Sequence, residues 1–495
     1  MYHKLLLLLS GLLISLAVEA HSGKPRTYVI IDTDCAADDL RAICMLLGDH
    51  DVEVMAVTTS TGALTPEAGR RKVEALLQEF HHQGIPVAAG REVAMKEPRW
   101  RKVAAGVSWG PSVAGNQPGS TAESLIVESV RNEKRPVTLV CLGALTNVSD
   151  VLKGNPEIKK RIAKVVWFNG GSKPMRGVNY EIDPEAADYV LESGVPVMLV
   201  SAVTDESVPV DRQFLTELAK MQSSPYARKV AQTHATPPLR DLVRSEHLKL
   251  WDDLVVLALT APQLFQKTSL SPTVEWYSID IAQEILPIEE QLLAIYRGPE
   301  NVDGKIFYHF PLDEGYYIRD VMPIIGRAVQ RYGLSEFRAA VLTNELHGHL
   351  GIFATVGVKM GIRAREYFAI GVDDMQVTTY AGSQPPVSCL NDGLQVSTGG
   401  TLGHGLITVA DMEPEQIRPE ATFSFKGKQV TLRLKPEYER RVREDLRKGV
   451  EMYGADTEAN WQYVRELALK YWLDWDRHEI FDILPQNQSV YENKI

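Results

Sequence analysis

Four aspartates lie close together near the start of the chain: Asp32, Asp34, Asp38 and Asp39. Such clustered carboxylates repel one another, and a helix N-terminus stabilises each of them by only about 0.3–1 kcal/mol. A hard cation with oxygen ligands, such as Ca²⁺, would compensate their charge. An acidic cap facing solvent is the alternative, but a cap needs one aspartate rather than four. We therefore predict a metal site in this stretch.

A strand and a helix must position these carboxylates. The apolar run at 28–31 predicts a buried strand, and apolar residues at helical spacing predict a helix over 39–47 that ends at Gly48. The aspartates thus follow the carboxyl end of a strand and open the next helix. Ligands of open α/β sheets bind at that edge.

Alternation of strands and helices continues to about residue 202. It predicts an α/β fold with a mostly parallel sheet and helices on both faces. A smaller α+β domain and a charged, helical tail follow. The predicted strands of the first domain are 28–31, 52–58, 86–89, 137–142, 164–168 and 196–201. The predicted units are 1–20, 24–330, 335–435 and 436–495.

The first twenty residues have the composition of a secretory signal peptide. Lys4 precedes a run of mainly apolar residues, and Val18 and Ala20 are small residues where a signal peptidase reads. A membrane anchor is the alternative, and no later stretch is long and apolar enough to span a bilayer. We predict a secreted or periplasmic protein without a membrane partner after cleavage. The net charge of −11 argues against nucleic acid as a partner.

The acidic stretch resembles the signature of the inosine–uridine-preferring nucleoside hydrolases, which reads Asp-Thr-Asp-Pro-Gly-x-Asp-Asp. Cys35 and Ala36 replace the Pro-Gly, and all four aspartates are kept. Three further segments are similar to that family in the same order: 142–147, 179–187 and 251–252. The resemblance covers roughly residues 26–330. It implies metal-dependent hydrolysis of the N-glycosidic bond of a ribonucleoside or a related N-riboside, giving free base and ribose.

The resemblance also implies roles for single residues. Asp32 would accept a proton from the attacking water, and Asp38 and Asn179 would hold ribose hydroxyls. A calcium ion would be bound by the carboxylates of Asp32, Asp39 and Asp252 and by the backbone carbonyl of Leu142. Oxygen ligands in an irregular shell suit calcium, and a metal makes water a nucleophile near neutral pH.

Three positions depart from the family. Gly62-Ala63 lacks an asparagine that would meet a ribose hydroxyl, and Gly177 stands where a glutamate would grip the sugar. Trp251 takes the place of a histidine that assists the departing base in some members. It could stack on a small, nucleoside-like substrate or pack in the core, but it cannot donate a proton at neutral pH. The alternative function is a non-catalytic, metal-dependent binding protein for a ribosylated or glycosylated ligand.

Residues 335–435 resemble the FmdE family, which is associated with formylmethanofuran dehydrogenase. Both motifs, His347-Gly348-His349 and 392–405, lack the cysteine of the family pattern. The residues left as zinc ligands by type are His347, His349, Cys389 and His404. With two cysteines gone, we predict weak or no structural zinc. One alternative is a domain that packs, forms a homo-oligomer or binds a small molecule. Another is that the hydrolase half serves only as a scaffold for chemistry in the second domain.

Overall fold

The computed structural model describes most of the chain after residue 26. The described ranges are 27–49, 51–112, 120–171, 173–202, 210–222, 224–279, 281–297, 306–307, 309–372, 375–455 and 457–485. The predicted signal peptide therefore lies outside the described residues. No helix within these ranges has both the length and the apolar character that crossing a bilayer requires.

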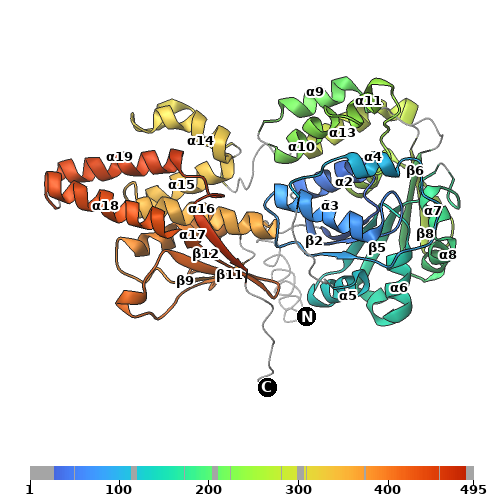
Figure 1. Ribbon diagram of the computed structural model, residues 1–495, viewed down its shortest axis with the longest axis horizontal. Helices are drawn as coiled ribbons and strands as arrows, with labels where there is room; N and C mark the ends of the chain where they lie inside the picture. Colours follow the sequence, from blue (N-terminus) through green and yellow to red (C-terminus); the bar gives the residue numbers. More distant parts are fainter. Residues whose placement is uncertain are drawn as a thin grey trace, which may run out of the picture.

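The first domain is built on a sheet of eight strands in which all but β7 run parallel. Figure 1 shows this sheet on the right, between two layers of helices. The prediction of a mostly parallel sheet is therefore confirmed. The order is β3 (Val87–Ala89), β2 (Val52–Thr59), β1 (Thr27–Thr33), β4 (Val137–Cys141), β5 (Ile162–Phe168), β6 (Val197–Ala202), β8 (Val274–Ile279) and β7 (Gln266–Ser269).

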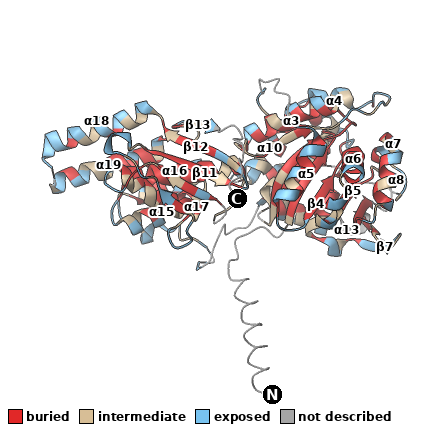
Figure 2. Ribbon diagram, turned by 90° about the horizontal axis from the view of Figure 1, so that it is seen from below, coloured by how far each residue is buried: buried red, intermediate tan, exposed pale blue. Residues whose placement is uncertain are grey.

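Alternating residues of each strand face opposite layers of helices. In β1, Val29 and Ile31 belong to one apolar cluster and Ile30 to the other, as the two-residue period of a strand requires. Strands buried on both faces explain the continuous apolar runs of the sequence, and they are red in Figure 2. The helices are α2 (Ala37–Gly48), α3 (Pro66–Glu79), α4 (Arg101–Gly106), α5 (Ala122–Asn132), α6 (Thr146–Gly154), α7 (Val178–Ile182), α8 (Pro184–Glu192), α9 (Arg212–Lys220), α10 (Pro225–His234), α11 (Leu239–Arg244), α12 (Asp253–Thr260) and α13 (Ile281–Arg297).

The second domain packs helices against a smaller mixed sheet with its own core. The strand order is β10 (Ile407–Val409), β9 (Gln376–Thr379), β11 (Glu420–Phe425), β12 (Lys428–Leu434) and β13 (Phe481–Pro485). The helices are α14 (Ile325–Tyr332), α15 (Leu334–His347), α16 (Ile352–Phe368), α17 (Leu390–Thr398), α18 (Pro436–Tyr453) and α19 (Glu458–Asp474).

The structure moves two predicted boundaries. Helix α14, assigned from sequence to the 24–330 unit, buries Ile325 and Ala328 in the core of the second domain. The predicted tail, 436–495, is helical only to Asp474, because β13 then pairs with β12 in the second sheet. Trp472 and Phe481 lie in the same core. The described part of the tail thus belongs to the second domain.

The two domains meet at the amino ends of the parallel strands. The turn between β11 and β12 inserts Lys426 between two buried carboxylates of the first domain, Glu53 and Glu133. The Lys426 ammonium lies 2.6 Å from Glu133 Oε2 and 4.6 Å from the ring centre of Tyr28. Although burial opposes it, Lys426 holds the pKa of Glu133 below its usual value.

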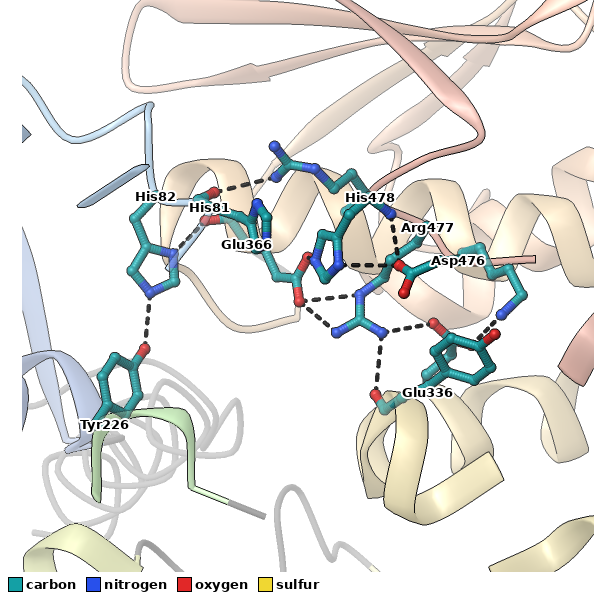
Figure 3. A network of polar contacts seen from close by, with 11 residues as sticks. His81, His82, Tyr226, Glu336, Glu366, Asp476, Arg477 and His478 are labelled. Carbon is teal, nitrogen blue, oxygen red and sulfur yellow. Dashed lines mark hydrogen bonds and ion pairs between the residues drawn. The ribbon is translucent and has the colours of Figure 1, made fainter. Parts of the chain in front are cut away.

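The end of α16 forms the second part of this interface. The Gly84 amide donates to the Tyr367 carbonyl at 2.6 Å, and a Cβ at Gly84 would lie 2.5 Å from that oxygen. His82 donates from Nδ1 to the Glu366 carbonyl (2.6 Å) and accepts from the Tyr226 hydroxyl (2.8 Å), as Figure 3 shows. Only glycine fits at position 84, so any larger residue there would disrupt this part of the interface.

Candidate active site

The carboxyl end of β1 leads through a sharp loop into α2. Cys35 adopts a φ of 64°, a left-handed conformation that residues other than glycine seldom take. The loop is held by the Asp39 carboxylate, which accepts hydrogen bonds from the amides of Ala36 (3.0 Å) and Cys35 (3.2 Å) and from the Thr33 hydroxyl. Asp39 therefore caps its own helix, which fixes the direction of its carboxylate.

Three carboxylates from two helices converge at this point. Ligand atoms of Asp38, Asp39 and Asp252 all lie within 4.8 Å of one another, and within the described residues no other such group of histidine, cysteine or acidic side chains occurs. Asp252 is brought there by α12, which it precedes. Burial first, and then the neighbouring carboxylates, raise the pKa values of Asp39 and Asp252 well above the ordinary range.

Oxygen atoms without hydrogen-bond partners show that this cluster fits a cation. Asp32 Oδ2 and Asp252 Oδ1 are buried, and neither has a hydrogen-bond partner. Buried carboxylate oxygens are normally satisfied, since leaving one unpaired costs about 1–3 kcal/mol or more. A divalent cation that binds oxygen would satisfy Asp252 Oδ1 and offset the repulsion among the three carboxylates.

Asp32 lies at the end of β1 with one oxygen committed and one free. Its Oδ1 accepts from the Thr58 hydroxyl at 2.6 Å and from Asn147 Nδ2 at 2.7 Å. Burial raises the pKa of Asp32 to about 6, although these hydrogen bonds oppose the shift. The three-carboxylate group contains Asp38 in place of Asp32, so the role of Asp32 as a ligand stays a prediction. Its free oxygen and raised pKa suit a proton acceptor.

Asp34 has a different task from its neighbours. Its two oxygens accept from the amides of Ala63 (3.0 Å) and Ala36 (3.2 Å), which ties the loop after β2 to the loop after β1. A Cβ at Gly62 would collide with this carboxylate at 1.9 Å. Burial raises the pKa of Asp34 to about 7. The sequence gives no reason to distinguish the four aspartates, whereas the structure shows that Asp34 connects the two loops.

The predicted Leu142 carbonyl and Asn179 lie together at the ends of neighbouring strands. Asn179 Nδ2 donates to the carbonyls of Leu142 (2.8 Å) and Phe168 (3.0 Å), so both amide hydrogens are committed to the backbone. Its oxygen remains for a ligand. At Gly177, φ is 150° and a Cβ would lie 2.2 Å from the Asn169 carbonyl. No side chain fits where the family pattern has its glutamate.

Trp251 lies at the surface beside Asp252. Its side chain is 42% exposed, so the interpretation of Trp251 as a core residue is wrong.

The sequence analysis missed the role of Thr58 and Asn147, which donate hydrogen bonds to Asp32. The pattern around Asn147 indicates only a cap or turn residue, and that around Thr58 only a strand. A polar residue at the carboxyl end of a buried strand was the available signal for Thr58.

The four candidate zinc ligands of the second domain are not brought together. The rings of His347 and His349 lie 4.3 Å apart, but no three of the candidate ligand atoms form a cluster within the described residues. His404 Nδ1 donates instead to the Gly399 carbonyl. His347 Nδ1 pairs with Asp392 at 2.7 Å, and its buried Nε2 has no hydrogen-bond partner.

Comparison with family models finds two matches along the chain. The model described as "Inosine-uridine preferring nucleoside hydrolase" matches residues 29–292, more than half of the 495 residues. The model described as "FmdE, Molybdenum formylmethanofuran dehydrogenase operon" matches residues 346–482. The two matches agree with the two domains, and the second one extends through the helices of the predicted tail.

Curated relatives include the pyrimidine-specific ribonucleoside hydrolase RihA of Salmonella paratyphi A, 34% identical over 182 residues. The match covers 34% of this chain and 58% of that protein. The relative from Escherichia coli O127:H6 is 32% identical over 185 residues, with the same coverage. A solved structure of the purine-preferring ribonucleoside hydrolase from Gardnerella vaginalis is 19% identical with a TM-score of 0.45, covering 55% of this chain and 99% of that one.

Proposed function

We propose that this chain, which belongs to the inosine-uridine preferring nucleoside hydrolase family, hydrolyses the N-glycosidic bond of a ribonucleoside or related N-riboside. One observation carries the proposal. The carboxylates of Asp38, Asp39 and Asp252 converge at the carboxyl ends of the strands, and a buried oxygen of Asp252 has no partner there. Such a cluster is suited to a divalent cation, and we propose calcium because its shell tolerates irregular oxygen ligands.

The reaction divides between the cation site and Asp32. A cation held by Asp39, Asp252 and the Leu142 carbonyl would supply Lewis-acid activation of water. Thr58 and Asn147 hold one oxygen of Asp32 and leave the other free to accept the proton of that water. The hydroxyl joins C1′ of the ribose as the C1′–N bond breaks. Clustered carboxylates stabilise the positive charge that develops on the sugar.

Trp251 cannot supply the proton that the leaving base needs, so the base takes this proton from solvent or from another acid. The exposed Trp251 offers an aromatic face for stacking on the base, and its indole is no acid at neutral pH. Substrates whose leaving group needs little protonation, such as nitrophenyl ribosides, should therefore be cleaved far better than inosine.

The direct test incubates purified full-length protein with a panel of purine and pyrimidine nucleosides and a nitrophenyl riboside. We expect free base and ribose in equal amounts, with release lost on chelation and restored by calcium. Asp252→Asn should abolish both the release and the calcium dependence. Failure to release base from any substrate, in protein that binds calcium, would contradict the proposal.

The missing sugar contacts favour a second candidate function. Ala63 has no amide side chain, position 177 admits none, and the amide hydrogens of Asn179 are committed to backbone carbonyls. A protein that binds a ribosylated ligand through the metal without turnover would show these losses. Calorimetric binding of a nucleoside without release of base would select this function over hydrolysis.

The place of action is a proposal that rests on the N-terminal sequence. A leader with Lys4, a mainly apolar stretch and Ala20 favours a secreted or periplasmic protein. Mass spectrometry of the exported protein should find a mature chain that begins near His21. An intact N-terminus in the cell interior would contradict it.

A further inference from the structure

Arg41 is completely buried on the helix that carries Asp38 and Asp39, and all three nitrogens of its guanidinium group make contacts. Its Nε and one terminal nitrogen donate to the two oxygens of Asp253 at 3.0 and 2.8 Å, the paired geometry of a strong ion pair. Further bonds reach the Lys249 carbonyl (2.6 Å) and His234 Nε2 (3.3 Å). Both side chains of the Arg41–Asp253 pair are 0% exposed.

The partners of Arg41 are themselves fixed. His234 Nδ1 donates to the Val230 carbonyl at 2.8 Å, so its Nε2 is the acceptor for Arg41. The Tyr296 hydroxyl donates to the Arg41 carbonyl at 3.1 Å. Arg41 thus joins helices α2, α10, α12 and α13 at one point, and its position is over-determined by the surrounding helices.

The ion pair links the two helices that carry the converging carboxylates. Arg41 follows Asp39 by two residues on α2, and Asp253 follows Asp252 directly at the start of α12. Burying two charges is no efficient way to add stability, since well-packed apolar side chains often do as well or better. Fixing the register of two elements is the best-attested use of such a pair.

We propose that the Arg41–Asp253 ion pair positions Asp252 against Asp38 and Asp39 and thereby sets the affinity of the cluster for a divalent cation. The inference rests on the metal site of the proposed function but requires no turnover. Arg41 is a positioning residue, because it acts on the cation through the two helices. Its planar fork matters, since a lysine ammonium cannot bind both oxygens of Asp253 in one plane.

The test measures calcium binding by titration calorimetry on metal-free, full-length protein without substrate. Arg41→Met and Asp253→Asn should weaken calcium binding about 10–100-fold, as loss of a group that orients metal ligands typically does. Arg41→Lys keeps the charge but loses the fork, and its affinity should fall between these variants and the unaltered protein. Saturating calcium should restore kcat in all three, because the reacting groups are unchanged.

A variant that removes both charges guards against a simple folding defect. Arg41→Met combined with Asp253→Leu replaces the pair with apolar side chains, so its melting temperature should recover toward that of the unaltered protein. Its calcium affinity should stay about tenfold or more below the unaltered value. Recovery of both properties would overturn the proposal.

Lys359 provides the matched control. It forms an ion pair with Glu336 in the second domain, and both side chains are 1% exposed. Lys359→Met should lower the melting temperature while leaving calcium affinity within about twofold. If Arg41→Met and Asp253→Asn behave like this control, the pair serves stability alone and the proposal is wrong. A protein that binds neither Ca²⁺, Mg²⁺ nor Mn²⁺ would overturn the metal site, and this inference with it.

Discussion

The two ends of the parallel strands both carry buried acidic side chains, and the cation that the chain supplies at the carboxyl ends, Arg41, forms its ion pair with Asp253, outside the group of three converging carboxylates. At the amino ends, Glu53 and Glu133 face Lys426 from the second domain. At the carboxyl ends, the groups that raise the pKa values of Asp39 and Asp252 after burial are other carboxylates. Repulsion that one end cancels within the chain is therefore left at the other for a bound cation.

The comparison separates a structural ion pair from a ligand site by a simple criterion. Buried carboxylates whose oxygens meet a cation of the chain hold the fold together, as at the domain interface. A buried carboxylate oxygen that has neither a hydrogen bond nor an ion pair among the described residues, such as Asp252 Oδ1, leaves repulsion that a ligand or a proton can remove. By the same criterion, the ion pair between Arg41 and Asp253 is structural.

The largest effect should come from the proton acceptor at the carboxyl end. Asp32→Asn keeps an oxygen in place but removes the ability to accept a proton, so the rate should fall about 10²–10⁴-fold. Initial rates on the best substrate at saturating calcium measure it. Unchanged calcium affinity in the variant would assign Asp32 to proton transfer alone. A rate within about twofold of the unaltered protein would show that another residue is the base.

The second largest effect should come from removal of the metal, which lowers the free energy of unfolding. A cation present at 100 times its dissociation constant adds about 2.7 kcal/mol to the free energy of unfolding. Scanning calorimetry with calcium and with a chelator should show this difference as a shift in melting temperature. The Asp252→Asn variant serves as the control, since it should melt at the same temperature in both conditions.

Removing the cation at the amino end should destabilise the protein without affecting the chemistry. Lys426→Met removes the ammonium that forms ion pairs with the buried Glu53 and Glu133, which costs about 1.5–3 kcal/mol of stability. Denaturant unfolding gives the free energy, and nucleoside hydrolysis below the transition gives the activity. A loss of activity before any loss of structure would mean that the two ends are coupled.

The last expected effect is a dependence of stability on pH at the acidic site. Burial raises the pKa of Asp32 to about 6 and that of Asp34 to about 7, above their values in the unfolded chain. These two carboxyls therefore bind more protons in the folded, metal-free protein than in the unfolded chain between pH 4 and 7, and their contribution to stability falls as the pH rises through that window. Saturating calcium should flatten the slope. Melting temperatures at pH 5 and pH 8, each measured with and without saturating calcium, decide it, because groups away from the site contribute equally to both conditions.

The spacing of apolar residues predicted the strands and helices of the first domain well, because each type of element has its own period. The domain boundary was misplaced for a physical reason: an amphipathic helix such as α14 shows that it packs, but not against which core. The sequence predicts those parts of the candidate site in which the residues lie close together along the chain. The Arg41–Asp253 pair, 212 positions apart, leaves no local pattern, and neither does the bond from Asn147 to Asp32 across 115 positions.

Helix α16 sets the distance between His347 and the interface with the first domain. Its first turn lies against His347, where a Cβ at Gly351 would touch the imidazole at 2.9 Å, and its last residues contact the first domain. Seventeen residues at 1.5 Å each make a strut about 25 Å long. This helix meets the first domain at the amino ends of the strands, whereas the converging carboxylates lie at their carboxyl ends, so the two sites face opposite edges of the large sheet. The fusion therefore holds two surfaces of different chemistry together at fixed stoichiometry.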